Sequence, residues 1–148
     1  MTKPIIESVA KALLINNKNE VLILTIGEYK ERPEKSFKPD LPGGLVDPGE
    51  NEYEAVMREI REETEIQVNR KDLEMVYSRT QFFNDEYKSV TKHLFISRVE
   101  SEVEITLSWE HSAYEWVRLE DLRDTELRSF YDEAIEYCFL NGILAVSA

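Results

Sequence analysis

Apolar residues fall into runs that predict a strand-rich protein. β-branched and aliphatic residues, alternating with polar ones in places, mark candidate strands at 8–15, 20–25, 72–83, 88–99 and 113–117. The first two runs are joined by the turn-forming cluster 16–19, and the next two by 84–87. Each pair is therefore expected to form a hairpin.

Two segments carry apolar residues at the spacing of an amphipathic helix. In the middle of the chain Tyr53, Val56 and Ile60 form one apolar stripe, and residues 125–140 form a longer one that includes Cys138. Strands with one central and one terminal helix predict an α/β sandwich. The 148 residues fit a single domain, 1–148, which is long enough to bury a core without disulfides.

The charge balance excludes one class of partner and permits another. With 18 Lys plus Arg against 30 Asp plus Glu, the net charge is −12. This argues against a nucleic acid duplex, whose phosphates demand a basic face. A small phosphorylated metabolite is compatible with an acidic protein when bound cations reverse the local field. The composition therefore predicts metal dependence.

Cysteine usage and the lack of apolar segments bear on localisation. Cys138 is alone and sits in an apolar helical pattern, so an inert buried thiol is expected. The first residues, Met1 to Pro4, lack the apolar core of a signal peptide, and no segment approaches the length of a bilayer span. These features predict a cytoplasmic protein without a membrane partner.

Three carboxylates are placed to share one face of the central helix. Residues three and four apart lie on the same side, so Glu59, Glu62 and Glu63 project together and repel one another. Acidic helix faces are usually only solvated. Here two turns precede the helix, at 42–44 and 47–50, and the glycines of the first let a backbone carbonyl approach a ligand. The combination indicates a site for a divalent cation.

Residues 44–66 resemble the signature of the Nudix hydrolase family. That signature is Gly, five residues, Glu, seven residues, Arg-Glu-aliphatic, any residue, Glu-Glu, any residue, Gly, aliphatic. The match fails at one place, where Glu65 replaces the glycine that leaves the helix with positive φ. We expect Glu65 to keep an ordinary negative φ and to have no chemical role. The resemblance implies the Nudix fold, an α/β/α sandwich with a mixed sheet.

The resemblance also implies a set of metal ligands. Glu62 and Glu63 would bind Mg²⁺ or Mn²⁺ together with a carbonyl oxygen of Gly43 or Gly44. Glu59 would either bind metal or act as the general base. Water would be the nucleophile, consistent with a motif that contains no Ser, Cys or His.

Supporting roles follow for residues around these ligands. Glu50 would support a further ion, and Arg58 would orient the carboxylates through its planar guanidinium. Glu110 lies in a stretch similar to one that many members carry before their last helix, and it is equally compatible with an extra ligand or base and with a surface charge. His93 and His111 lie far along the chain with no evident partner, so both are expected to be structural or exposed.

The sequence offers two sets of candidate substrate-binding residues, one basic and one aromatic. Segment 27–40 carries four cations in an acidic background and is either a mobile surface loop, the slightly favoured reading, or a lid that binds phosphates: Lys30, Arg32, Lys35 and Lys38. Phe37 is a candidate for stacking a base or for anchoring the loop. Four aromatic residues could form a stacking platform, although strand aromatics more often pack a core: Tyr77, Phe82, Phe83 and Tyr87.

The predicted function is water-mediated, metal-dependent cleavage of a phosphoanhydride bond. The resemblance implies a substrate in which a nucleoside diphosphate is linked to another group, as in nucleoside triphosphates, nucleotide sugars, ADP-ribose or dinucleoside polyphosphates. One alternative is a catalytically weak Nudix-like module that binds nucleotides as a sensor, but such modules typically lose motif carboxylates, which are all present here. The third alternative is a plain acidic interaction domain without catalytic function. The sequence is also compatible with a homodimer.

Overall fold

The computed structural model describes residues 3–100 and 103–146 and places all strands in one mixed sheet. Its seven strands are β1 (Ile5–Ile15), β2 (Glu20–Ile26), β3 (Pro39–Asp40), β4 (Gly43–Leu45), β5 (Leu73–Phe83), β6 (Lys88–Arg98) and β7 (His111–Arg118). The main order is β3-β2-β1-β6-β5, while β4 also pairs with β1 and β7 with β2. β1 and β6 run parallel and the other pairs are antiparallel.

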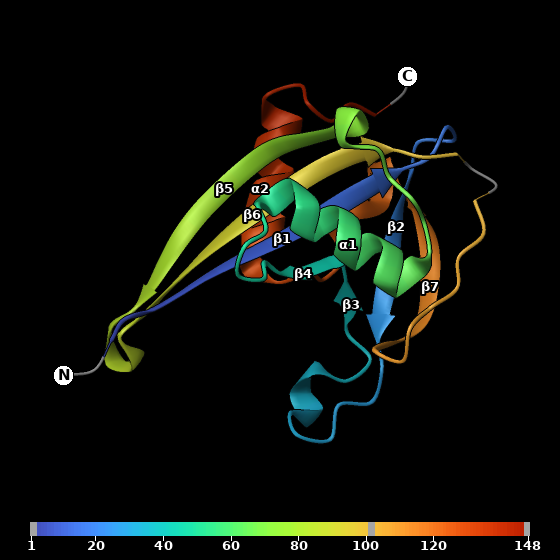
Figure 1. Cartoon of the computed structure of the whole chain (residues 1–148). Coiled ribbons are helices and arrows are strands. Elements are labelled where there is room, and N and C mark those ends of the chain that lie inside the picture. The colour runs from blue at the N-terminus through green and yellow to red at the C-terminus, as the bar shows by residue number, and fades with distance from the viewer. Residues whose placement is uncertain (1–2, 101–102, 147–148) are drawn as a thin grey trace.

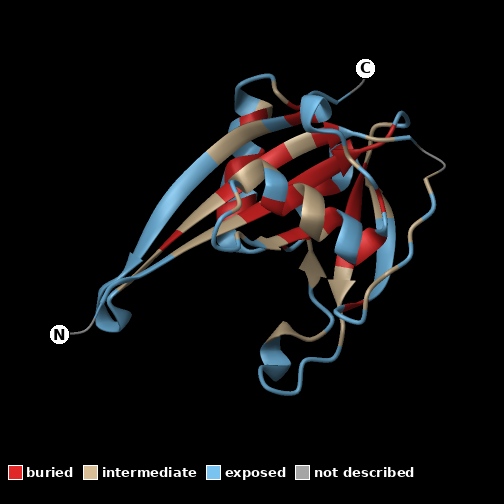
Figure 2. Cartoon of the chain, in the orientation of Figure 1, coloured by how far each residue is buried: buried red, intermediate tan, exposed pale blue. Residues whose placement is uncertain are grey.

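The two helices cover opposite faces of this sheet (Figure 1). Residues of β1 alternate between the faces, as a period of two requires. Ala12 and Leu14 pack in the core beneath α1 (Glu52–Thr64), whereas Leu13 and Ile15 pack in the core beneath α2 (Ser129–Leu140). The buried residues follow the strands where the helices cover them (Figure 2). The expected α/β/α sandwich with a mixed sheet is confirmed.

The second hairpin has the form expected of it, and the first does not. β5 and β6 pair antiparallel along nearly their whole length, and their far ends project from the body of the molecule (Figure 1). β1 and β2 follow the predicted turn but are in register only at Ile15 and Val21. They diverge because β1 pairs with β4 and β6, while β2 pairs with β3 and β7.

The N-terminus of α1 is stabilised by a capping box. The Asn51 side chain accepts a hydrogen bond from the Glu54 N–H at 2.9 Å, and the Glu54 side chain accepts one from the Asn51 N–H at 3.0 Å. Two backbone donors that the first helical turn leaves unpaired are thereby satisfied. This cap fixes the start of the helix that carries the motif carboxylates.

The exit from α1 overturns the expectation for Glu65. Glu65 has φ 63° and ψ 11°, the left-handed conformation, and its N–H donates to the Arg61 carbonyl at 2.8 Å. This conformation is unfavourable by about 1 kcal/mol for a residue with a Cβ. The next residue, Ile66, is buried with 2% of its surface exposed, and its N–H donates to the Thr64 hydroxyl. Burial of Ile66 requires the sharp turn, so the chain adopts the glycine-like conformation without glycine.

The terminal helix begins later than the apolar pattern predicts. α2 starts at Ser129, and Arg128 before it is extended with φ −62° and ψ 151°. Leu127 nevertheless packs in the core, which explains why periodicity alone extended the helix to residue 125. Cys138 is fully buried, as expected, and burial raises the pKa of its thiol to about 11. Within the described residues, no helix combines the length and apolarity needed to cross a membrane.

Candidate active site

The carboxylates of α1 lie against the two glycines of β4. The buried Glu63 accepts a hydrogen bond from the Gly43 N–H at 2.7 Å through its Oε1 atom. A Cβ atom on Gly44 would lie 2.9 Å from the Glu59 carboxylate carbon, so any other residue there would displace the Glu59 carboxylate. Glu62 points outward, with 54% of its side chain exposed. The helix thus brings Glu59 and Glu63 to the backbone of β4, as the motif predicted.

The first glycine turn is in fact a strand. Gly43 pairs with Lys11 and Gly44 with Ala10 across the β1–β4 ladder. Gly43 has φ +135°, and a Cβ there would lie 2.2 Å from the Ala10 carbonyl oxygen. Gly43 is therefore needed for the close approach of β1 and β4.

Arg58 contacts three carboxylates of the motif. Its guanidinium binds both oxygens of Glu50, with distances of 2.9 and 2.7 Å. It also donates to Glu59 at 3.0 Å and to Glu62 at 3.2 Å. We call these four residues the Arg58 group. Hydrogen bonds from Arg58 hold the pKa of Glu50 down to about 2. The structure thus gives Arg58 the contacts that orientation of the carboxylates requires.

A second set of charged residues lies beneath Glu63 and was missed from sequence. Lys11 Nζ lies 2.6 Å from Asp40 Oδ1, and the other Asp40 oxygen lies 3.1 Å from His111 Nε2. His111 Nδ1 in turn lies 3.4 Å from Glu63 Oε2. We call Lys11, Asp40, His111 and Glu63 the buried network. It overturns the expectation that His111 has no partner, whereas His93 is structural, between the hydroxyls of Ser78 and Ser8.

Burial raises the pKa of both Glu63 and Asp40, but their neighbours lead to opposite outcomes. The pKa of Glu63 rises to about 8, and the Gly43 hydrogen bond only partly opposes this. Burial would also raise the pKa of Asp40, but Lys11 and His111 outweigh it and hold that pKa well below its usual range. The pKa of Glu59 is raised as well, mainly by burial and further by the charges of Glu62 and Glu110. Glu63 and Glu59 are therefore the carboxylates that gain most from a nearby cation.

The donor types fit a hard divalent cation. Carboxylate and carbonyl oxygens are the ligands that Mg²⁺ prefers, and Glu59, Glu62, Glu63 and the carbonyls of Gly43 and Gly44 supply them. No group of three or more His, Cys, Asp or Glu side chains in the described parts of the chain is placed to hold a metal ion as it stands. Arg58 instead engages oxygens of Glu59 and Glu62, so a cation would compete with Arg58 for these two carboxylates.

Comparison with known proteins agrees with this geometry. A profile of the NUDIX domain matches residues 7–138. The chain belongs to the Nudix family. It is 40% identical over 81 residues to the mouse bis(5'-nucleosyl)-tetraphosphatase (asymmetrical), a match that covers 54% of this chain and 55% of that protein. The aligned part thus spans about half the length of this relative.

Solved structures share the fold over most of the chain. The MutT protein of Methanosarcina mazei is 29% identical, with a TM-score of 0.74 over 93% of this chain and 95% of that one. An Ap4A hydrolase of Caenorhabditis elegans is 26% identical, with a TM-score of 0.62 over 90% of this chain and 98% of that one. These similarities support the Nudix fold for the whole described sheet.

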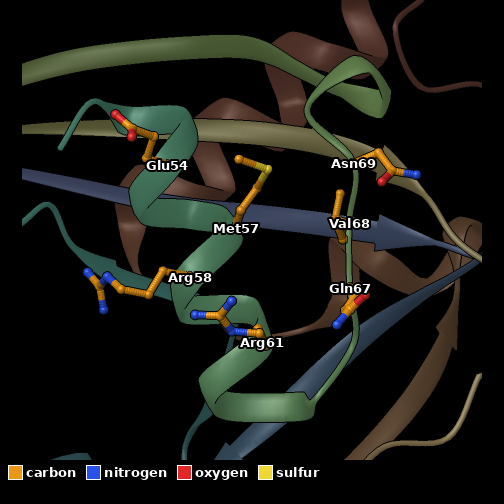
Figure 3. A pocket seen from close by; sticks show the side chains of 7 residues that line it. All are labelled: Glu54, Met57, Arg58, Arg61, Gln67, Val68 and Asn69. Carbon is orange, nitrogen blue, oxygen red and sulfur yellow. The ribbon is translucent and has the colours of Figure 1, made fainter.

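Two hollows lie near the candidate site. One, of about 430 Å³, lies between α1 and the segment that follows it, and Arg58 points away from that segment (Figure 3). The other, also of about 430 Å³, we call the Trp109 pocket, and its lining includes Tyr29, Lys35, Asp40, Trp109, Glu110 and His111. Neither Glu59 nor Glu63 lines either hollow. The Trp109 pocket nevertheless adjoins the buried network, because Asp40 and His111 belong to both.

The residues expected to bind substrate are dispersed. Arg32, Phe37 and Lys38 lie in the segment between β2 and β3, where Phe37 is 63% exposed and has φ 61°. Phe83 ends β5, at the far end of the hairpin that projects away from α1 (Figure 1). Tyr77 packs on Phe130 and Tyr137 of α2, the structural use of a strand aromatic. Glu110 is exposed in the turn before β7, at the edge of the Trp109 pocket.

Proposed function

We propose that this Nudix chain is a metal-dependent hydrolase that cleaves a phosphoanhydride bond in a nucleoside diphosphate linked to another moiety. The observation that carries this proposal is a pair of carboxylates held against the β4 glycines with raised pKa values, the buried Glu63 and the half-buried Glu59. The full set of motif carboxylates supports an enzyme over a nucleotide sensor. Dinucleoside tetraphosphates are the first substrate class to test, since the mouse relative carries that name.

The residues have distinct roles in this reaction. Glu62 and Glu63, with a carbonyl of Gly43 or Gly44, would hold Mg²⁺ or Mn²⁺, and Glu50 would support a further ion. A bound cation would offset charge on phosphoryl oxygens and favour ionisation of water. Arg58 keeps Glu50 and Glu59 in place through its hydrogen bonds. This division assigns metal binding to Glu62 and Glu63 and orientation to Arg58.

The chemical step is a displacement at phosphorus. The oxygen of a water molecule forms a bond to phosphorus, the bond from phosphorus to the bridging oxygen breaks, and the leaving phosphate departs as an anion. The proton of the water would pass to Glu59 or to Glu110, whose charges are close enough to interact. Arg32 and Lys38 would bind the phosphates, and Phe37 or Phe83 would contact the base; these four roles remain predictions.

A substrate panel on the full chain tests the proposal. Diadenosine tetraphosphate, ATP, ADP-ribose and a nucleotide sugar are incubated with Mg²⁺, with Mn²⁺ and with excess EDTA, and products are separated by chromatography. We expect turnover of at least one substrate, its loss in EDTA and its return with added metal. Turnover that persists in EDTA would refute the metal dependence, and nucleotide binding without any turnover would favour the sensor.

The remaining expectations concern the setting of this enzyme. We propose that residues 1–148 act as one domain and that the unpaired thiol of Cys138 is kept reduced in the cytoplasm. Cell fractionation tests the compartment, and sedimentation tests whether the chain forms a homodimer.

A further inference from the structure

The Trp109 pocket is formed where two loops meet at one end of the sheet. β2 and β7 pair antiparallel with Ile26 opposite His111, so the loop after β2 and the turn before β7 emerge side by side. The Gly27 N–H donates to the Glu110 carbonyl at 2.9 Å and fixes the two loops to each other. Residues from both loops can therefore contact one ligand.

Two aromatic rings open onto this pocket. Trp109 is 86% exposed and Tyr29 is 37% exposed. Neither ring packs against another aromatic ring of the described residues. A tryptophan left almost wholly in water forgoes the gain of burying a large apolar surface. Two open rings at one hollow are suited to a flat, aromatic ligand.

Trp109 is also tied to the Nudix helix. The residue before it, Ser108, donates its backbone N–H to the Glu63 carbonyl at 3.2 Å. Two residues after it, His111 lies 3.4 Å from the Glu63 carboxylate. These contacts connect the loop that carries Trp109 to Glu63 of α1.

Charge decides which part of a nucleotide this pocket suits. Its lining includes three carboxylates, Glu28, Asp40 and Glu110, and one cation, Lys35, which lies 5.8 Å from the centre of the Tyr29 ring. Such a wall repels a chain of phosphates but tolerates a neutral base. Lys35 can meet the first phosphate beyond the base.

We propose that the Trp109 pocket binds the nucleobase of the substrate, with Trp109 and Tyr29 as the stacking residues that set affinity. This inference rests on the proposed function. It moves the stacking site from Phe37 and Phe83 to a pair of residues that the sequence pattern does not single out.

Tryptophan fluorescence tests base binding without turnover. The chain has two tryptophans, and the second, Trp116, packs against the core beneath α1. The full chain in EDTA is titrated with AMP and, separately, with inorganic tripolyphosphate. We expect AMP to quench the fluorescence, tripolyphosphate to leave it unchanged, and the AMP response to disappear in Trp109→Phe. A quench by tripolyphosphate, or an AMP response that survives in Trp109→Phe, would overturn the assignment.

Kinetics supply the matched control. Trp109→Ala and Tyr29→Ala should each raise KM for the best panel substrate by about tenfold, while kcat stays within twofold, because stacking is lost but the carboxylates are untouched. Leu140→Ala removes an apolar side chain that is 77% exposed at the end of α2 and should change neither constant. Unchanged KM in both pocket variants, or an equal rise in Leu140→Ala, would refute the pocket.

The two proposals can fail separately. If the pocket variants behave as wild type while EDTA still abolishes turnover, the base site is wrong and the hydrolase stands. If no panel substrate is turned over, the hydrolase fails, and the AMP titration still decides whether Trp109 contacts a base.

Discussion

The Arg58 group and the buried network hold two glutamates of the motif in opposite ways. In the Arg58 group a guanidinium donates directly to Glu50, in the turn before α1, and the pKa of Glu50 falls to about 2. In the buried network Glu63 of α1 faces a histidine nitrogen and a backbone N–H, and burial raises its pKa to about 8. The contrast shows that burial and neighbouring groups decide the charge of each glutamate.

The difference also indicates a division of labour. Glu50 has its charge satisfied within the protein, so it has less to gain from a cation. Glu63 is buried with no direct Arg or Lys partner among the described ion pairs, so a cation would relieve the cost of ionising it. Predictions that perturb one set and spare the other test this division.

The largest effect is expected for Glu63→Gln. The amide keeps the size of the side chain but removes the ligand charge, so kcat should fall by on the order of a hundredfold or more. Folding should persist, because a neutral group is cheaper to bury than a charge. Glu62→Gln, on the exposed side, should lower kcat to a similar degree. Steady-state rates at saturating Mg²⁺ and thermal melting measure both effects, and wild-type rates in the two variants would refute the ligand assignment.

The stability of the metal-free protein should depend on the Glu63 charge. The pKa of Glu63 is about 8 in the folded chain against an ordinary value of 4.5, so between these values the folded state holds the extra proton. Its contribution to the free energy of unfolding is complete below pH 4.5 and is lost as the pH rises toward 8. Denaturant unfolding in EDTA should show a loss on the order of 1 to 3 kcal/mol across this range.

Glu63→Gln is the control for that experiment, since it removes the titrating group. Its unfolding free energy should vary less between pH 4.5 and 8 than that of the wild-type protein. Equal slopes in the two proteins would show that Glu63 does not titrate in this range.

Arg58→Lys should have an intermediate effect. An ammonium cannot reproduce the bidentate contact with Glu50 while also reaching Glu59, so kcat/KM should fall by about tenfold. A fall in kcat at constant KM would place the loss in the chemical step. A variant that keeps full activity would show that the shape of the guanidinium is dispensable.

A smaller effect is expected for His111→Gln. The amide can keep one polar contact with Asp40 but supports Glu63 less rigidly, so kcat should fall about threefold to tenfold. The Mg²⁺ concentration for half-maximal activity should rise as well, which a merely structural role would not cause. An unchanged Mg²⁺ requirement would remove His111 from the positioning of Glu63.

The smallest effect is expected for Glu65→Gly, at the exit of α1. Glycine relieves a left-handed conformation that costs about 1 kcal/mol but also increases the freedom of the unfolded chain. The midpoint of unfolding should therefore shift by only a few degrees, and kcat/KM should stay within twofold. A rate that rises tenfold would identify the natural chain as an impaired enzyme.

The sequence was informative where partners are close along the chain. The resemblance to the Nudix signature implied that Arg58 orients the carboxylates, and Arg58 contacts Glu50, Glu59 and Glu62, which all lie within one turn and one helix. The strand and helix pattern likewise predicted the layers of the fold. The expectation of a negative φ was wrong at Glu65, where the burial of Ile66 accompanies a left-handed backbone conformation that is costly for a residue with a Cβ.

The buried network could not be predicted in the same way. Lys11 and Asp40 are 29 residues apart, and Asp40 and His111 are 71 residues apart, so only the completed sheet brings them together. A single signal was available, namely a lysine inside the apolar run of β1. A charge in that position needs a buried partner, but sequence does not say which one.

The contacts of Arg58 indicate that folding of this protein can precede metal binding. Since its guanidinium already neutralises the outer glutamates, the newly made polypeptide can reach its native shape before it meets any ion. Binding of a metal ion would then replace Arg58 as the positive partner of these glutamates and would not be required for folding. Under the proposed metal dependence, a cell short of magnesium would accumulate a folded but inactive protein that regains activity when the ion returns.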